Sequence, residues 1–404
     1  MHKFSPFFRF AIWLVLLVAL LFALPQFVSA QASSETITGE WHLLIEGKGG
    51  QGSTFYIMHF DPAGTLDVRK QDSGINTRDA AMTWTLENGI LRIQPAPNSA
   101  MSELGSMEFT RVSATRFTTQ HGDKTLPLNQ RNVPLTLLHL LGVLIGLIFI
   151  NEVGRKYRWV TILLFMVFPV VASFYWASSG NVTHLFRWVK LYSVVFAVVW
   201  FYFIRFTNLH KKRWALWICA AILSVNILEA CTQDFAMGFL PNILNAIAGL
   251  LNIVVLSRWS AIQPDGSKSN DMLWPGMTTF WIIAYDIWNW TFVYLNFPEH
   301  ASYHAIVLAA CTIPSLFIKK GTWLQARAYT LATWMMYLFT FQPFIDSVIV
   351  PLPRTETLML LAALLSIGSN LIYAVLHFRW VWTKKAPDWL QVGQSEVAYQ
   401  VNKA

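Results

Sequence analysis

The sequence VPLTLLHLLGVLIGLIFIN occupies residues 133–151 and contains no Asp, Glu, Lys or Arg. A helix of this length, rising ~1.5 Å per residue, covers nearly all of the ~30 Å hydrocarbon core of a bilayer. The composition of the chain agrees, because 54% of its 404 residues are apolar and only 13% are charged. In soluble domains, about a quarter of the residues are charged. We therefore expect an integral membrane protein.

Eight further apolar segments follow the first, and each is long enough to cross a bilayer as a helix. They cover residues 159–177, 184–206, 214–233, 239–257, 273–296, 301–318, 322–345 and 356–377. Residues 133–385 are therefore predicted to form an all-α membrane bundle of about nine transmembrane helices. Within the sixth segment, Pro275 is expected near the first helical position, where its missing N–H is harmless.

The basic residues between the segments predict the orientation of the bundle. Fifteen of them lie in alternate connections or after the last helix: Arg155, Lys156, Arg158, Arg205, Lys211, Lys212, Arg213, Arg258, Lys268, Lys319, Lys320, Arg327, Arg379, Lys384 and Lys385. The other inter-helix connections hold only Arg187, Lys190 and Arg354. Because cytoplasmic connections are enriched in Lys and Arg, this bias predicts a multi-pass protein of the cell (inner) membrane. Its C-terminus and the tail, residues 386–404, are then cytoplasmic, and the residues before the first helix are periplasmic or extracellular.

Residues 1–30 have the pattern of a secretory signal peptide. Lys3 and Arg9 precede an apolar run at 11–23, and Val28-Ser29-Ala30 supplies small residues for cleavage. The alternative is an uncleaved anchor helix. Either version places the following residues outside the cytoplasm.

Residues 31–132 are predicted to form a small exported all-β domain. Strand-like runs occupy residues 41–47, 53–60, 65–69, 81–86, 90–94, 107–112, 115–120 and 124–128. Turn-forming residues separate them, and Asn88-Gly89 is a strong hairpin signal because a type I′ turn needs φ > 0 at both central positions. Met82, Trp84 and Leu86 alternate with threonines, which predicts one apolar strand face. A barrel or a sandwich fits this pattern, and it contains no cysteine.

The same segment resembles bacterial lipocalin-like domains. The resemblance rests on Gly39-Glu40-Trp41, on the turn at 60–65 and on the stretch from Trp84 to Leu91. It implies a small module that binds a ligand or a protein. A structural cap without a ligand is the alternative.

Polar side chains recur on single faces of several predicted helices. Asn226, Glu229 and Gln233, for example, are spaced i, i+3, i+7. Counted from the outer helix ends at ~1.5 Å per residue, seven polar side chains share a layer about 5–15 Å below the outer surface. They are Lys190, Glu229, Asn242, Asn245, Asp286, Asn289 and His304. Because ionisable groups in hydrocarbon are costly, these residues are predicted to line a binding site open to the exported side.

Each of these residues also has a structural interpretation. Glu229 and Asp286 are then partners of Lys190 that only fix helix packing, and the asparagines hydrogen-bond across helix pairs. His300 and His304 have the i, i+4 spacing of a metal pair, but two histidines alone do not define a site, and no metal or cofactor is predicted.

The membrane part is similar to an uncharacterised bacterial multipass family, a domain of unknown function. The residues that carry the similarity include Asn245–Gly249, Asp271–Pro275 and the sequence WIIAYDIWN at 281–289. It covers residues 151–346, and it implies the membrane topology without an activity.

The sequence favours a protein that binds or transports a small polar solute or a lipid headgroup from the outer side. One alternative is an intramembrane enzyme acting on a lipid, with Glu229, Asp286 and His304 as acid, base or metal ligands, although a non-enzyme is preferred. The other is an assembly factor whose exported domain recruits a protein partner. Nucleic acid is not expected as a partner, because the basic residues follow the membrane topology.

Overall fold

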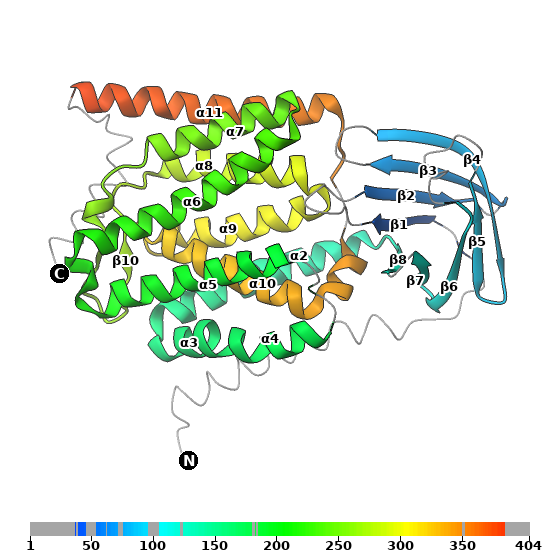
Figure 1. The fold of residues 1–404 in the computed structure, drawn as a ribbon, viewed down its shortest axis with the longest axis horizontal. Helices are drawn as coiled ribbons and strands as arrows, with labels where there is room; N and C mark the ends of the chain where they lie inside the picture. Colours follow the sequence, from blue (N-terminus) through cyan, green and yellow to red (C-terminus); the bar gives the residue numbers. More distant parts are fainter. Residues whose placement is uncertain are drawn as a thin grey trace, which may run out of the picture. The chain divides into compact units, whose positions relative to one another are not determined.

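The computed structural model describes residues 37–383, apart from residues 38, 46–53, 62, 72–75, 96–104, 122–123, 180–181, 183–184 and 350–351. The predicted signal peptide and cytoplasmic tail lie outside the described residues. The chain divides after Arg131 into two compact units, a β unit and a helical unit (Figure 1).

The β unit is a closed barrel of eight antiparallel strands in sequence order. The strands are β1 Gly39–Ile45, β2 Thr54–Phe60, β3 Thr65–Gln71, β4 Asn76–Glu87, β5 Ile90–Gln94, β6 Met107–Ser113, β7 Arg116–His121 and β8 Lys124–Gln130. Pairing of β1 with β8 closes the barrel and leaves no free strand edge. The predicted small β fold is confirmed as a barrel.

Local turn chemistry explains the hairpins. Asn88 and Gly89 both have positive φ, 53° and 76°, as the type I′ interpretation requires. In the turn before β3, Gly64 has φ 86° and its N–H donates to the carbonyl oxygen of Asp61 at 3.0 Å. These two turns fix the registers of β4 with β5 and of β2 with β3.

Side chains fill the interior of the barrel. Trp41 is 1% exposed and meets Phe60 and Phe117 edge to face, with ring centroids 6.3 and 5.4 Å apart. Trp84 is only partly buried, and its indole N–H donates to the carbonyl oxygen of Thr65. The lipocalin-like relationship remains a prediction.

Glu40 gives the barrel a predictable pH dependence. Its carboxylate accepts hydrogen bonds from His42 and Arg131, at 2.9 and 2.7 Å. The bond from His42 and the charge of Arg131 outweigh burial and lower the pKa of Glu40 from 4.5 to about 2. Because the folded pKa is depressed, the stabilisation is complete above pH 4.5 and disappears as the pH falls towards about 2.

We expect Glu40→Gln to lower the thermal midpoint of the barrel at neutral pH, with the difference from the wild type shrinking as the pH falls through this window. Circular dichroism of the β signal measures it. Glu108→Gln is the control, because Glu108 forms an exposed ion pair with Arg92 that contributes little. A difference for Glu40→Gln that is constant with pH would contradict the assignment.

The helical unit contains a helix within each of the nine predicted segments. Its elements are α2 Val133–Lys156, α3 Arg158–Ile162, η2 Leu163–Val167, α4 Phe168–Ser178, α5 Leu185–Phe206, η3 Asn208–Lys211, α6 Arg213–Met237, α7 Leu240–Val254, η4 Trp259–Ala261, α8 Thr279–Asn296, η5 Pro298–His300, α9 Ala301–Phe317, α10 Trp323–Val348 and α11 Glu356–Thr383. In Figure 1, α11 lies along α7 and α8, and α10 lies beside α2, α5 and α9.

Six helices of the described chain are long and apolar enough to span a membrane. They are Val133–Lys156, Arg158–Ser178, Arg187–Phe206, Arg213–Met237, Pro298–Phe317 and Glu356–Thr383. The other three predicted spans correspond to α7, which has 15 residues, and to α8 and α10, which bury polar side chains such as Asn289 and Arg327. The count of nine spans therefore remains a prediction.

The segment between α7 and α8 corrects the predicted start of the sixth helix. Residues Gln263–Pro264 (β9) pair with Met272–Leu273 (β10), and α8 begins only at Thr279. The Thr278 hydroxyl accepts the N–H of Trp281 as the N-cap, so Pro275 does not start this helix. The backbone at Gly276 passes so close to Ser257 that a Cβ would lie 2.0 Å from the Ser257 carbonyl oxygen.

Candidate functional site

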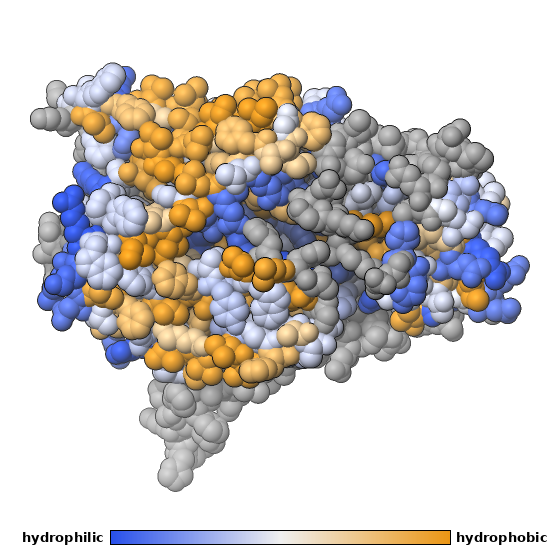
Figure 2. Space-filling view, in the orientation of Figure 1, coloured by the Kyte–Doolittle hydropathy of each residue, from blue (hydrophilic) through white to orange (hydrophobic). Residues whose placement is uncertain are grey.

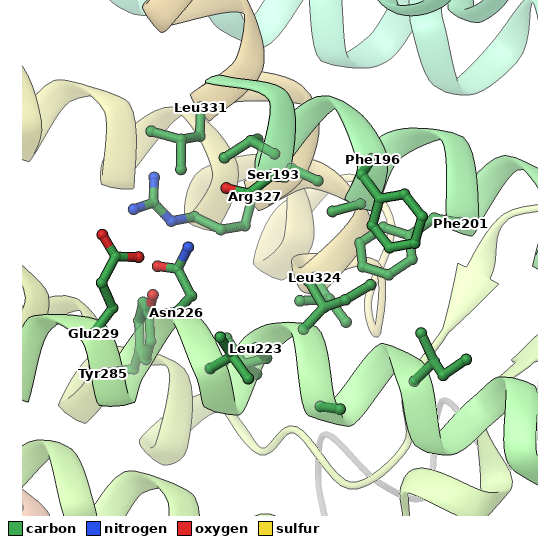
Figure 3. A pocket seen from close by; sticks show the side chains of 17 residues that line it. Ser193, Phe196, Phe201, Leu223, Asn226, Glu229, Tyr285, Leu324, Arg327 and Leu331 are labelled. Carbon is green, nitrogen blue, oxygen red and sulfur yellow. The ribbon is translucent and has the colours of Figure 1, made fainter. Parts of the chain in front are cut away.

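A cavity of about 360 Å³ lies between α5, α6, α8 and α10. Its apolar part is lined by residues that include Phe196, Phe201, Leu223, Leu324 and Leu331. Asn226, Glu229, Tyr285 and Arg327 line the same cavity, and Figure 3 shows their polar ends gathered at one end of it. The cavity is therefore amphipathic.

A smaller chamber of about 150 Å³ continues from the polar end. It shares Asn226, Glu229, Arg327 and Leu331 with the larger cavity, so the two spaces adjoin. Its further polar lining residues are Lys190, Gln233, Asn289 and His304. We call this smaller space the polar chamber.

Helical periodicity explains the α6 wall of the polar chamber. Asn226, Glu229 and Gln233 lie one turn apart on one face, and all three line the chamber. The remaining polar walls come from Lys190 on α5, Asn289 on α8, His304 on α9 and Arg327 on α10. Side chains from five helices thus meet at one place.

Lys190 and Glu229 form an ion pair with Nζ and Oε2 2.8 Å apart. Their side chains are 24% and 36% exposed, so the pair is not sealed within the protein. Both side chains line the polar chamber, so a ligand there would lie beside the pair.

Asn289 joins His304 to Arg327. Its Oδ1 accepts hydrogen bonds from His304 Nε2 at 2.6 Å and from Arg327 Nη2 at 3.0 Å. Because an amide oxygen only accepts, His304 carries a hydrogen on Nε2. Asn289 thus holds the orientation of the Arg327 guanidinium.

Arg327 is the unusual member of this group. It is 6% exposed, and its Nε and Nη1 atoms are buried without a hydrogen-bond partner. Within the described part of the chain it forms no ion pair with a carboxylate, although its charge interacts with that of Asp286 at longer range. Buried arginines are normally paired, because an unpaired charge loses its hydration without compensation.

Asp286 lies in the same helix as Asn289 but is not among the lining residues of either space. Its Oδ2 accepts a hydrogen bond from the Thr312 hydroxyl at 2.6 Å, and its Oδ1 is buried without a partner. The structure therefore does not bring Asp286 into contact with Lys190.

Asn242 and Asn245 belong to a separate buried cluster around Asp234. Their amide groups each donate to the Asp234 carboxylate at 2.8 Å, and Asn296 donates at 2.7 Å. The Ser366 hydroxyl donates to Asn245 Oδ1 at 2.7 Å. These two asparagines thus hold α6, α7, α8 and α11 together and do not line the polar chamber.

Arg327 is not among the site residues predicted from the sequence, because it follows Lys319 and Lys320 and fits the pattern of a basic connection. The structure places it inside α10, in contact with Asn289. Fourteen basic residues then remain on the predicted cytoplasmic side. The feature of the sequence that could have identified Arg327 is its place within the predicted helix at 322–345, because α10 continues through Gln325 and Arg327 without a break.

The histidine pair at the start of α9 is split between different environments. His304 bonds Asn289, while His300 lies 4.0 Å from the Glu299 carboxylate. Among the described residues, no three His, Cys, Asp or Glu side chains are arranged to hold a metal ion.

The comparisons with known proteins concern the helical unit. A model described as a family of unknown function, DUF5692, matches residues 130–392, which is more than half of the chain. The match agrees with the similarity seen in the sequence and extends it at both ends. No curated protein and no solved structure matches the chain. The chain therefore belongs to the DUF5692 family of unknown function.

Proposed function

We propose that the helical unit binds an amphipathic ligand, with its headgroup in the polar chamber and its apolar tail in the larger cavity between α5 and α6. The observation that carries this proposal is the continuity of the two spaces, which share Asn226, Glu229 and Arg327. One end is apolar and the other is charged, which matches the two halves of a lipid-like molecule.

The surface around the larger cavity supports lateral entry from the bilayer. Its lining residues Phe196 on α5 and Val225 on α6 are 51% and 63% exposed on the outer faces of these helices. Figure 2 shows hydrophobic residues over much of the visible surface of the helical unit. A small polar solute would gain nothing from these apolar walls, whereas an acyl chain would bury surface at about 25 cal/mol per Å².

The orientation of the site is part of the proposal. The basic bias of the connections favours insertion in the cell (inner) membrane with the polar chamber in its outer half. The ligand headgroup then enters from the exported side, where the barrel is also expected.

The intramembrane enzyme is the second candidate, and its observation is that Glu229 and His304 line one chamber. Their contacts favour binding over catalysis, because Glu229 pairs with Lys190 and His304 with Asn289. In the part of the chain that the structure describes, neither the Glu229 carboxylate nor the His304 ring hydrogen-bonds to a Ser, Thr or Cys side chain that it could activate.

Blocking the larger cavity tests the proposal. Ala221 lines this cavity on α6, and Ala221→Trp is expected to fill it and to abolish retention of lipid that co-purifies with the wild type. Native mass spectrometry of the full-length protein, released from detergent, measures the bound lipid.

The matched control is Ala177→Trp, the same change at an exposed position on α4. This variant is expected to keep the bound lipid. Equal retention by both folded variants would show that lipid binds elsewhere and would refute the proposed site.

A further inference from the structure

Arg327 carries information about the chemistry of the headgroup. Figure 3 shows its guanidinium directed to the same space as the Glu229 carboxylate and the Asn226 amide. Nη2 donates to Asn289, while Nε and Nη1 make no hydrogen bond of normal geometry, and the Tyr285 hydroxyl interacts with the guanidinium. A planar guanidinium with unsatisfied N–H groups on two of its edges suits an oxyanion as a partner.

Lys190, the other cation of the polar chamber, already has a counter-ion. The charge of Lys190 is balanced by Glu229 at 2.8 Å, so this pair is neutral as a unit. Asp286 accepts a hydrogen bond from Thr312, and its charge interacts with Arg327 only at longer range, without an ion-pair contact. The guanidinium is therefore the charge at this site without a contacting counter-ion.

The number of donors favours a phosphate over a carboxylate. Besides Arg327, the chamber is lined by Lys190 and by the side-chain amides of Asn226 and Gln233. A carboxylate offers two oxygens to these donors, whereas a phosphomonoester offers three terminal oxygens and carries a greater charge.

We infer that the ligand is a phosphate-bearing lipid whose headgroup is anchored by Arg327, with Lys190 as a second donor once the phosphate replaces Glu229 as its partner. This inference rests on the proposed function and names the ligand class for the same site. Asn289 acts as a positioning residue, because it holds the guanidinium.

The test uses the full-length protein in detergent and two lipids with identical acyl chains, phosphatidic acid and diacylglycerol, which differ only in the phosphate. The wild type is expected to bind phosphatidic acid at least about tenfold more tightly than diacylglycerol, as measured by native mass spectrometry titration. Arg327→Gln is expected to lose roughly ten- to a hundredfold of the affinity for phosphatidic acid and to leave diacylglycerol binding unchanged.

Arg213→Gln is the matched control, because Arg213 is exposed at the start of α6 and faces neither space. Arg327→Lys keeps the positive charge but lacks the planar guanidinium, and it is expected to lose an intermediate part of the affinity for phosphatidic acid. This variant provides the test if Arg327→Gln does not fold. Inorganic phosphate is the competitor that distinguishes a lipid headgroup from a free anion.

Equal binding of the two lipids, unaffected by Arg327→Gln, would overturn the inference and leave the proposed function standing. Binding of neither lipid would overturn both. If inorganic phosphate raised the thermal midpoint of the protein as much as phosphatidic acid does, the phosphate would not need to come from a lipid. That result would overturn the lipid part of the inference.

Discussion

Replacing Asp234 by alanine is expected to lower the free energy of unfolding of the helical unit by several kcal/mol. Asp234 is fully buried and accepts hydrogen bonds from Asn242, Asn245 and Asn296. Without the carboxylate these amides lose an acceptor, and a buried donor left unsatisfied costs about 1–3 kcal/mol. The thermal midpoint from fluorescence-detected size-exclusion chromatography in detergent measures the loss.

Two variants bracket this result. Asp234→Asn keeps one acceptor oxygen and is expected to retain part of the stability, while Glu356→Ala removes an exposed carboxylate and is expected to change little. If Asp234→Ala melted like the wild type, the cluster would not hold the helices together. Asn242 and Asn245 would then need another role.

Arg205→Ala is expected to have a comparable effect at the opposite, basic end of the helices. The guanidinium donates to the carbonyl oxygens of Ser269, Asn270 and Arg155, at 2.7, 3.0 and 2.6 Å, and lies 3.8 Å from the Asp271 carboxylate. Its side chain is fully buried. Removing one partner of a buried charged network destabilises by about 3–5 kcal/mol.

The same thermal assay measures this loss, and Arg213→Ala supplies an exposed arginine for comparison. Because Arg205 ties down the segment that precedes α8, the variant is also expected to expose that segment to protease. A wild-type midpoint for Arg205→Ala would mean that the carbonyl groups find other donors.

Much of the barrel was predictable because its signals are local. Asn88-Gly89 demands a tight hairpin from its own backbone preferences, and the alternation of Met82, Trp84 and Leu86 identifies a strand without reference to the rest of the chain. Closure of the sheet depends on the pairing of Trp41 with Gln130, far apart in sequence, so the sequence left barrel and sandwich equally open.

The site was predictable in part, because counting residues along a helix gives depth but not direction around the bundle. Lys190, Glu229, Asn289 and His304 were placed at one depth and do line one chamber. Asn242 and Asn245 share that depth but face Asp234, whose amide partners come from two other helices. Which face of each helix turns inward is decided by packing between distant segments, and one sequence does not encode it locally.

The position of Arg327 also could not be predicted from its place in the sequence. A basic residue eight positions after Lys319 looks like part of a cytoplasmic connection, and only the contact with Asn289 of α8 reveals that it lies inside the unit. Helices α8 and α10 are less apolar than the six candidate spans. Helices surrounded by protein can carry polar side chains that lipid-facing helices exclude.

The most direct test of the account is a density map of the full-length protein in lipid nanodiscs, obtained by electron cryomicroscopy. We expect one elongated density that runs from the apolar cavity beside Leu223 and Leu324 to the polar chamber. Its compact end is expected within hydrogen-bond distance of Arg327. Density for isolated waters alone in the chamber, with the apolar cavity closed by its own side chains, would contradict the proposal that this site holds an amphipathic ligand.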